Sequence, residues 1–216
     1  MNVKNYLFVA AIAFFGLTLT ACSDDDDNEK TSGKASQYDS HAVDLGLPSG
    51  TLWSDENIGA NAPEEFGDYY AWGALVPYDA YTAEKYTVDT KNAGADWSGN
   101  PAYDVVTLKY GGEWRTPTTG EFSELILNTT KEWTTLNGVK GLRFTGTNGK
   151  SIFLPAAGYA VDTSKQRVGF FGAYVTSTAD TGYEGLGIRG EINAAGAGEA
   201  GYYSFHGCSV RGVRSK

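Results

Sequence analysis

Side chains that carry out nucleophilic catalysis are scarce in this chain, which has two histidines, His41 and His206, and a cysteine near its carboxy-terminal end, Cys208. Hydrolytic catalysis needs a nucleophile, a base and an orienting group in one place, and neither histidine adjoins a nucleophile-elbow pattern. Glu64 and Glu65 are carboxylates of the type a glycosidase uses, but they are neighbours in a loop led by proline and are expected to be solvated. The residue inventory predicts that the protein is not an enzyme.

The other cysteine, Cys22, follows a segment typical of a lipoprotein signal peptide. Lys4 supplies a positive charge, residues 7–19 are apolar, and Thr20 and Ala21 place small side chains directly before the cysteine. The alternative is a membrane anchor helix, but the apolar run is shorter than the roughly 20 residues that a membrane span requires. We therefore expect residues 1–21 to be a signal peptide.

The segment Leu19 to Cys22 resembles the lipobox of bacterial lipoproteins, which implies cleavage before Cys22 and attachment of lipid to that residue. Several acyl chains form a stable membrane anchor. The residues that follow resemble the acidic export signal of Bacteroidetes-type lipoproteins: Ser23, Asp24, Asp25, Asp26 and Asp27. The alternative is a solvated acidic linker. The resemblance implies a lipid-anchored protein of the outer membrane that faces the cell exterior.

The remaining organisation is simple. Residues 22–41 are predicted to form a flexible tether after the lipid-anchored cysteine, because almost no apolar side chain there is available for burial. Residues 42–216 fit one domain of ordinary size. Its glycines, most of the 28 in the chain, and an aromatic content of 13% predict many short strands joined by tight turns.

The charge balance excludes one large class of partner. Cleavage after residue 21 removes Lys4 and no acidic residue, and so changes the formal net charge from −9 to −10. Nucleic-acid-binding domains usually carry a basic surface, whereas Lys and Arg are scattered here and no glycine-rich phosphate loop is present. We expect no nucleic-acid partner.

Two short helices are predicted among the strands, which makes the fold class α+β. The first spans about residues 100–110, with Asn100 as cap and Pro101 in the first turn, although the β-branched residues at 105–107 favour a strand instead. The second spans about residues 119–128, where Thr118 and Glu121 form a capping box. Asn148 and Gly149, between two alternating segments, predict a tight hairpin with both residues at positive φ.

Five segments in order resemble motifs of the Fibrobacter succinogenes major paralogous domain family. They are Val43–Trp53, Gly67–Gly73, Gly111–Thr118, Ser151–Tyr159 and Ser209–Arg214. The resemblance implies a C-type-lectin-like fold, in which the opening and closing strands pair and two helices flank a sheet that carries long irregular loops. It also places three tryptophans in the packing of the domain rather than at a sugar platform: Trp53, Trp72 and Trp114.

Related lectin-like folds include calcium-dependent lectins and an enzyme class that makes formylglycine in sulfatases. The calcium-binding tripeptides of those lectins, such as Glu-Pro-Asn and Trp-Asn-Asp, do not occur here, and we expect no metal and no cofactor. Formylglycine formation relies on a cysteine pair, whereas Cys208 is accompanied only by the lipid-bearing Cys22. Cys208 is expected to be a small buried residue, with a reactive thiol as the alternative.

Binding is the function that remains. In lectin-like domains the ligand face is usually built by irregular segments of the carboxy-terminal half, which here means about residues 170–206. The candidate ligand-binding residues are Tyr174, Tyr183, Tyr202, Tyr203 and His206, because their flat rings and polar tips suit sugar stacking or protein contact; the alternative is that they pack inside. We expect a surface lipoprotein that binds an extracellular glycan or protein. The alternatives are a structural or accessory subunit of a surface assembly and, third, a cryptic enzyme.

Overall fold

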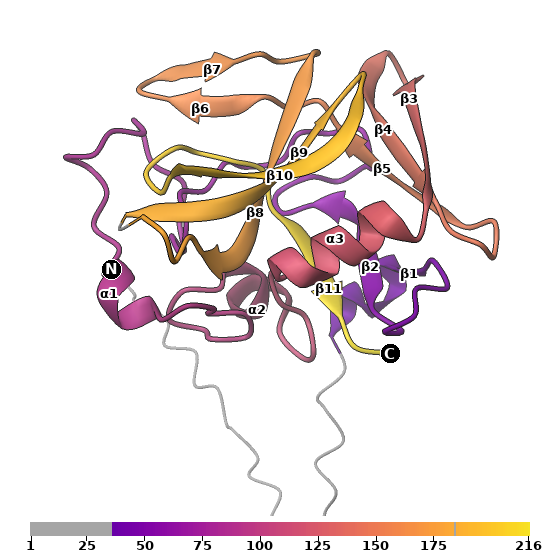
Figure 1. Cartoon of the computed structure of the whole chain (residues 1–216), viewed down its shortest axis with the longest axis horizontal. Helices are drawn as coiled ribbons and strands as arrows, with labels where there is room; N and C mark the ends of the chain where they lie inside the picture. The colour runs from indigo at the N-terminus through magenta and orange to yellow at the C-terminus, as the bar shows by residue number, and fades with distance from the viewer. Residues whose placement is uncertain (1–35, 184) are drawn as a thin grey trace, which may run out of the picture. The chain divides into compact units, whose positions relative to one another are not determined.

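The computed structural model describes residues 36–183 and 185–216. This part has a mixed α+β fold, in which mostly short antiparallel strands form four small sheets accompanied by three short helices (Figure 1). The predicted α+β class is confirmed at this level. The predicted signal peptide, the lipid-bearing Cys22 and the acidic run at 23–27 lie outside the described residues. No described helix has the length and apolar character that crossing a bilayer requires.

The opening and closing motifs meet in one sheet. Its strands are β1 (Ala42–Asp44), β2 (Leu52–Asn57) and β11 (Arg211–Arg214), and β2 lies in the middle. Trp53 of β2 stands opposite Val43 on one side and Val213 on the other, and it is fully buried. The last strand therefore pairs with the second strand, β2, and not, as expected, with the first strand, β1, although all three share one sheet.

A bulge interrupts β2. From Trp53 opposite Val213 to Asn57 opposite Arg211, β2 advances by four residues while β11 recedes by only two, so the two strands lose register. The Ser54 hydroxyl bridges this irregularity, because it accepts from the Glu56 amide at 3.3 Å and donates to the Glu56 carbonyl at 3.0 Å. A bulge bends its strand and redirects the side chains that it carries.

The second sheet consists of β8 (Phe171–Ala179), β9 (Leu186–Asn193) and β10 (Gly196–Tyr203), with β9 in the middle. The expectation of irregular structure across 170–206 is wrong for these strands. They form a paired sheet with one register shift, between Val175 and Ala179 of β8. Two glycines of β9 let large rings approach the backbone: Gly187 lies against the indole of Trp72 and Gly190 against the ring of Phe122. Both rings would collide with any larger side chain.

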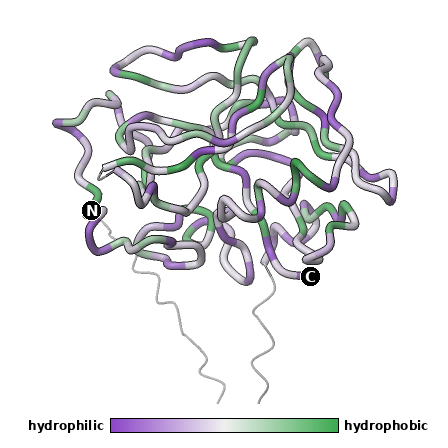
Figure 2. Tube along the Cα trace, viewed as in Figure 1, coloured by the Kyte–Doolittle hydropathy of each residue, from purple (hydrophilic) through white to green (hydrophobic). Residues whose placement is uncertain are grey.

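Two hairpin units complete the strands. One sheet joins β3 (Thr130–Leu136), β4 (Val139–Thr145) and β5 (Ser151–Pro155), and a two-stranded sheet joins β6 (Tyr159–Val161) and β7 (Ser164–Gln166). The predicted hairpin is confirmed as β4–β5, whose hydrophilic tip projects at the right of Figure 2. Only Gly149 of the predicted pair has positive φ, because the Gly149 amide donates to the Gly146 carbonyl at 3.0 Å and the turn is therefore centred on Thr147 and Asn148.

The helices are α1 (Thr90–Ala93), α2 (Val105–Tyr110) and α3 (Thr119–Leu127). Helix α3 has the predicted capping box of Thr118 and Glu121, and it packs against the β8–β9–β10 sheet. Helix α2 begins later than predicted, since Asp104, not Asn100, caps it by accepting from the amides of Val106 and Thr107. Helix α1 is too short to leave a clear periodic signal in the sequence.

Residues 36–41 correct the predicted extent of the tether. Gln37–His41 form a 3-10 helix, η1, that Ser36 caps. The ring of Tyr38 stacks on Tyr110 with centroids 3.8 Å apart, and the Trp114 indole donates to Asp39 at 3.0 Å. These two contacts supply the burial that composition alone did not reveal.

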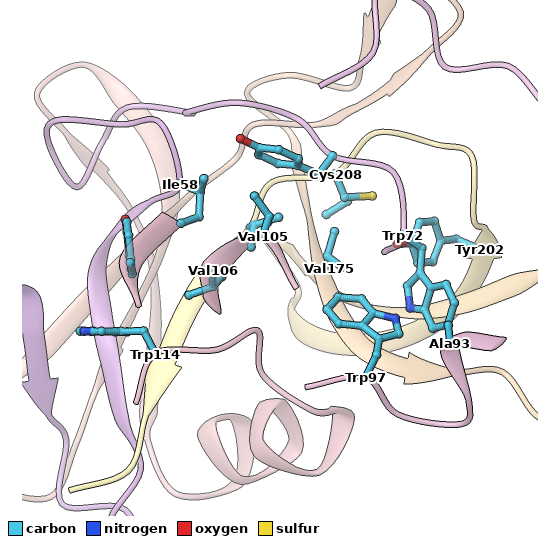
Figure 3. Close-up of a cluster of buried hydrophobic side chains, with 14 of the residues drawn as sticks. Ile58, Trp72, Ala93, Trp97, Val105, Val106, Trp114, Val175, Tyr202 and Cys208 are labelled. Carbon is cyan, nitrogen blue, oxygen red and sulfur yellow. The ribbon is translucent and has the colours of Figure 1, made fainter. Parts of the chain in front are cut away.

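The largest apolar cluster contains Trp72, Trp97 and Tyr202, whose rings gather around Val175 and Cys208 (Figure 3). The three tryptophans expected to pack inside, Trp53, Trp72 and Trp114, are all fully buried. Cys208 is buried as predicted, and burial raises the pKa of its thiol to about 11. The thiol is therefore protonated, and unreactive as a nucleophile, near neutral pH.

Candidate functional site

An aromatic hollow of about 350 Å³ lies beside β9 and β10. We call it the Arg189 pocket, and its lining residues are Tyr159, Leu186, Arg189, Gly201, Tyr202, Tyr203 and His206. Ring faces and a few polar groups in one concave surface are the usual make-up of a ligand site.

Three elements position this lining. Arg189 lies on the central strand β9, Tyr202 and Tyr203 end the edge strand β10, and Tyr159 begins β6. His206 sits in the turn after β10, where its amide donates to the Tyr203 carbonyl at 2.9 Å. The turn is attached to β6, because residues 160 and 207 exchange two backbone hydrogen bonds of 2.7 and 2.9 Å. Backbone pairing therefore fixes His206 relative to the ring of Tyr159.

The base of the pocket is a cation held among rings. The Arg189 guanidinium carbon lies 5.0 Å from the ring centroid of Tyr159, 5.3 Å from that of Tyr202 and 5.4 Å from that of Phe171. Its side chain is only 12% exposed and donates to Glu191 at 2.7 Å. Burial lowers the pKa of Arg189, but Cys208 and Glu191 outweigh it and raise that pKa overall. The guanidinium is a fixed, permanently charged donor.

The rim of the pocket is a set of packed rings. Tyr203 stacks on Phe205 with centroids 5.3 Å apart and meets His206 edge-on at 5.5 Å. His206 in turn stacks on Tyr159 at 5.8 Å. Burial, with repulsion from Arg189, lowers the pKa of His206 below its ordinary value. The imidazole is therefore neutral at pH 7 and presents one donor and one acceptor nitrogen.

The structure brings together three of the five predicted binding residues. Tyr203, 60% exposed, and His206 form the rim, while Tyr202 is 5% exposed and contributes its ring to the floor. The Tyr202 hydroxyl has no hydrogen-bond partner among residues 36–183 and 185–216. Tyr174 belongs to the core, since it is fully buried and donates to the Pro155 carbonyl at 2.7 Å. Tyr183 is exposed beside a separate hollow of about 150 Å³.

Sequence reasoning missed Arg189, Tyr159 and Phe205. Arg189 is the only cationic residue between Gly182 and Gly201, and that isolation was the available signal. Tyr159 ends a segment that we used only for the family resemblance, and the attachment of β6 to the turn after β10 brings it to the pocket.

The pocket offers flat ring faces, a fixed guanidinium and a neutral imidazole, a set that suits stacking and hydrogen bonding with a polar, ring-shaped or planar ligand. No family model matches the chain, and no curated protein and no solved structure shows significant similarity to it. The pocket geometry and the sequence motifs are therefore the grounds for a functional proposal.

Proposed function

We propose that the protein is a surface-exposed lipoprotein that binds an extracellular glycan or protein without covalent chemistry. The observation that carries this proposal is the Arg189 pocket, in which Tyr203 and His206 form an accessible aromatic rim over a cation whose side chain is only 12% exposed. Tyrosine and arginine are the residue types that contribute most binding energy where they surround a recessed contact.

The proposed fold is the C-type-lectin-like fold of the Fibrobacter succinogenes major paralogous domain family. The pairing of β2 with β11 and the presence of α2 and α3 support it. The proposed location is the outer membrane, facing the exterior, with lipid on Cys22; the lipobox-like segment and the acidic run at 23–27 support it. Both proposals are independent of the identity of the ligand.

A multivalent binding assay tests the function. Liposomes that carry the lipidated protein would be applied to an array of host and microbial glycans and to mucus and matrix proteins, because clustering amplifies weak contacts. We expect specific binding that Tyr203→Ala removes. Phe170→Ala is the matched control, since Phe170 is also a largely exposed ring but lies outside the pocket lining. Binding that survives Tyr203→Ala and a second rim change, His206→Ala, would place the site elsewhere.

Protease treatment of intact cells tests the location. An exposed lipoprotein is cleaved before lysis, and substitution of Asp24 to Asp27 by alanine should protect it by retaining it inside. Cleavage that occurs only after lysis would refute the outward orientation.

A second candidate function is that of a subunit in a surface assembly. Strand β10 lies at the edge of its sheet, and its first six residues are Gly and Ala except for Glu199, so side chains offer little obstruction to an added strand. Co-purification in detergent tests this candidate. A stoichiometric partner that is lost in Ala197→Pro would favour the assembly function over ligand binding, because the hairpin register turns the Ala197 amide away from β9 and towards the free edge.

A further inference from the structure

We propose a second site, for a divalent transition-metal ion, made by His41, Asp55 and Glu56. The His41 Nδ1 atom lies 2.9 Å from Asp55 Oδ1 and 3.8 Å from Glu56 Oε1. One ligand atom from each of the three side chains lies within 4.8 Å of the other two. We call this group the His41 site, and it shares no residue with the Arg189 pocket.

The bulge in β2 explains how neighbouring residues can share the site. In a regular strand, Asp55 and Glu56 would point to opposite faces of the sheet. The register loss between Trp53 and Asn57 spans both residues, and their carboxylates reach the same imidazole. Bulges often redirect side chains next to functional sites. The third ligand, His41, is the last residue of η1, the segment that Tyr38 and Asp39 attach to the core.

Glu56 provides the independent observation that points to a ligand. Its side chain is only 8% exposed, yet among the described residues no donor forms a hydrogen bond with its carboxylate, and the His41 ring lies 3.8 Å away. A buried carboxylate is stable when it is paired or coordinates a metal.

The donor set selects the class of ion. An imidazole nitrogen favours Zn²⁺ and related transition metals, whereas Ca²⁺ and Mg²⁺ take oxygen ligands. Two donors that each lie about 2.1 Å from a tetrahedral Zn²⁺ are about 3.4 Å apart, so the two His41 distances need only small adjustments. Three protein ligands would leave a fourth position for water or for a group from a partner. The two carboxylates supply two negative charges, and Arg211 is the nearby cation that opposes binding.

Binding of Zn²⁺ and Co²⁺ to the full chain tests the proposal. The protein would be produced without a polyhistidine tag, stripped with a chelator, and titrated with Zn²⁺ by calorimetry and with Co²⁺ by visible absorption. We expect one site whose affinity falls by at least roughly tenfold in His41→Ala, with loss of the Co²⁺ bands, because a ligand change costs no less than the loss of an outer-shell partner. His206→Ala is the matched control, since these are the two histidines of the chain.

A second variant and a second class of possible ligand complete the test. Glu56→Gln preserves the shape of the side chain and should also weaken Zn²⁺ binding, so it replaces His41→Ala if that variant fails to fold. The acidic residues Asp24 to Asp27 offer only oxygen ligands, and binding there would be unaffected by His41→Ala. Equal Zn²⁺ affinity in the wild type, His41→Ala and Glu56→Gln, or no Zn²⁺ binding by the wild type, would overturn the proposal and leave His41 and Asp55 as a hydrogen-bonded pair.

Discussion

The ring of Phe122 on α3 lies against the backbone of Gly190 on β9, so closely that a Cβ atom at position 190 would stand 2.3 Å from Phe122 Cζ. This contact lets the helix approach the sheet that carries Arg189, the residue before Gly190. The packing of α3 and the position of the pocket cation are therefore coupled through one glycine.

Gly190→Ala should destabilise the fold by about 1–3 kcal/mol, because the added methyl group overpacks a rigid contact. Chemical denaturation measures the change in the free energy of unfolding. Gly198→Ala is the control, since a Cβ atom there would meet nothing within 4 Å. Equal stability of the two variants would contradict the proposed steric coupling.

Arg211 is a buried cation whose guanidinium binds neutral groups. It donates to Asn57 Oδ1 at 2.8 Å and to the carbonyls of Ser54 and Phe153 at 3.0 Å. Arg211→Lys cannot reproduce this three-way contact and should cost about 2–5 kcal/mol in unfolding free energy. Arg143→Lys, which alters an exposed pair with Glu132, should cost less than about 1 kcal/mol. A comparably small effect at Arg211 would show that its hydrogen bonds are replaceable.

His206 should make stability depend on pH. Its pKa in the folded protein is lowered below the ordinary 6.5, so the unfolded chain binds the proton more readily. The contribution of the neutral ring is complete above pH 6.5 and is lost as the pH falls from 6.5 towards the folded pKa. Denaturation of the wild type and His206→Gln at pH 8 and pH 5 isolates this effect, because other groups titrate in both. Between pH 8 and pH 5 the wild type should lose more stability than the variant. An equal loss in both proteins would contradict the predicted contribution of His206.

Tyr38 should connect η1 to the core. Tyr38→Ala removes the stack on Tyr110, which is worth about 0.5–1.5 kcal/mol beyond the area it buries. Limited proteolysis should then cut within residues 36–41, whereas the wild type and the exposed control Gln37→Ala should resist cleavage there. Equal cleavage of the wild type, Tyr38→Ala and Gln37→Ala would show that residues 36–41 belong to the flexible tether that the sequence predicted.

Local signals in the sequence predicted the elements that local interactions stabilise. The capping box of α3 and the alternation around β4–β5 were sufficient for those two elements. The start of α2 was misplaced because Asp104 owes its position to a distant contact: its carboxylate also accepts from the Thr116 amide at 2.9 Å and from the Thr116 hydroxyl at 2.7 Å. No pattern within residues 100–110 reveals that contact.

The residues of the candidate site also separate into those that local sequence predicted and those that distant contacts bring together. Tyr203 and His206 were predictable as neighbouring polar-tipped rings, whereas Arg189 joins them only through the β9–β10 register, which sets Gly187 opposite Tyr202. Tyr174 was misjudged because the first seven residues of β8 are all buried, so its sequence does not alternate between an inner and an outer face. His41 was assigned to the tether, and a bulge in β2 has no local sequence signature that would have paired it with Asp55 and Glu56.

The pairing of β2 with β11 has a practical consequence for engineering. Asp39 contacts Arg214 at 2.5 Å and Asp44 contacts Lys216 at 2.8 Å, so the two ends of the described chain run side by side. A short linker could join them, and new termini could be opened at the exposed β4–β5 tip, where Gly149 has open space around it. Such a circular permutant would retain every strand pair, because the sheet holds the ends together whatever the order in which the polypeptide is read.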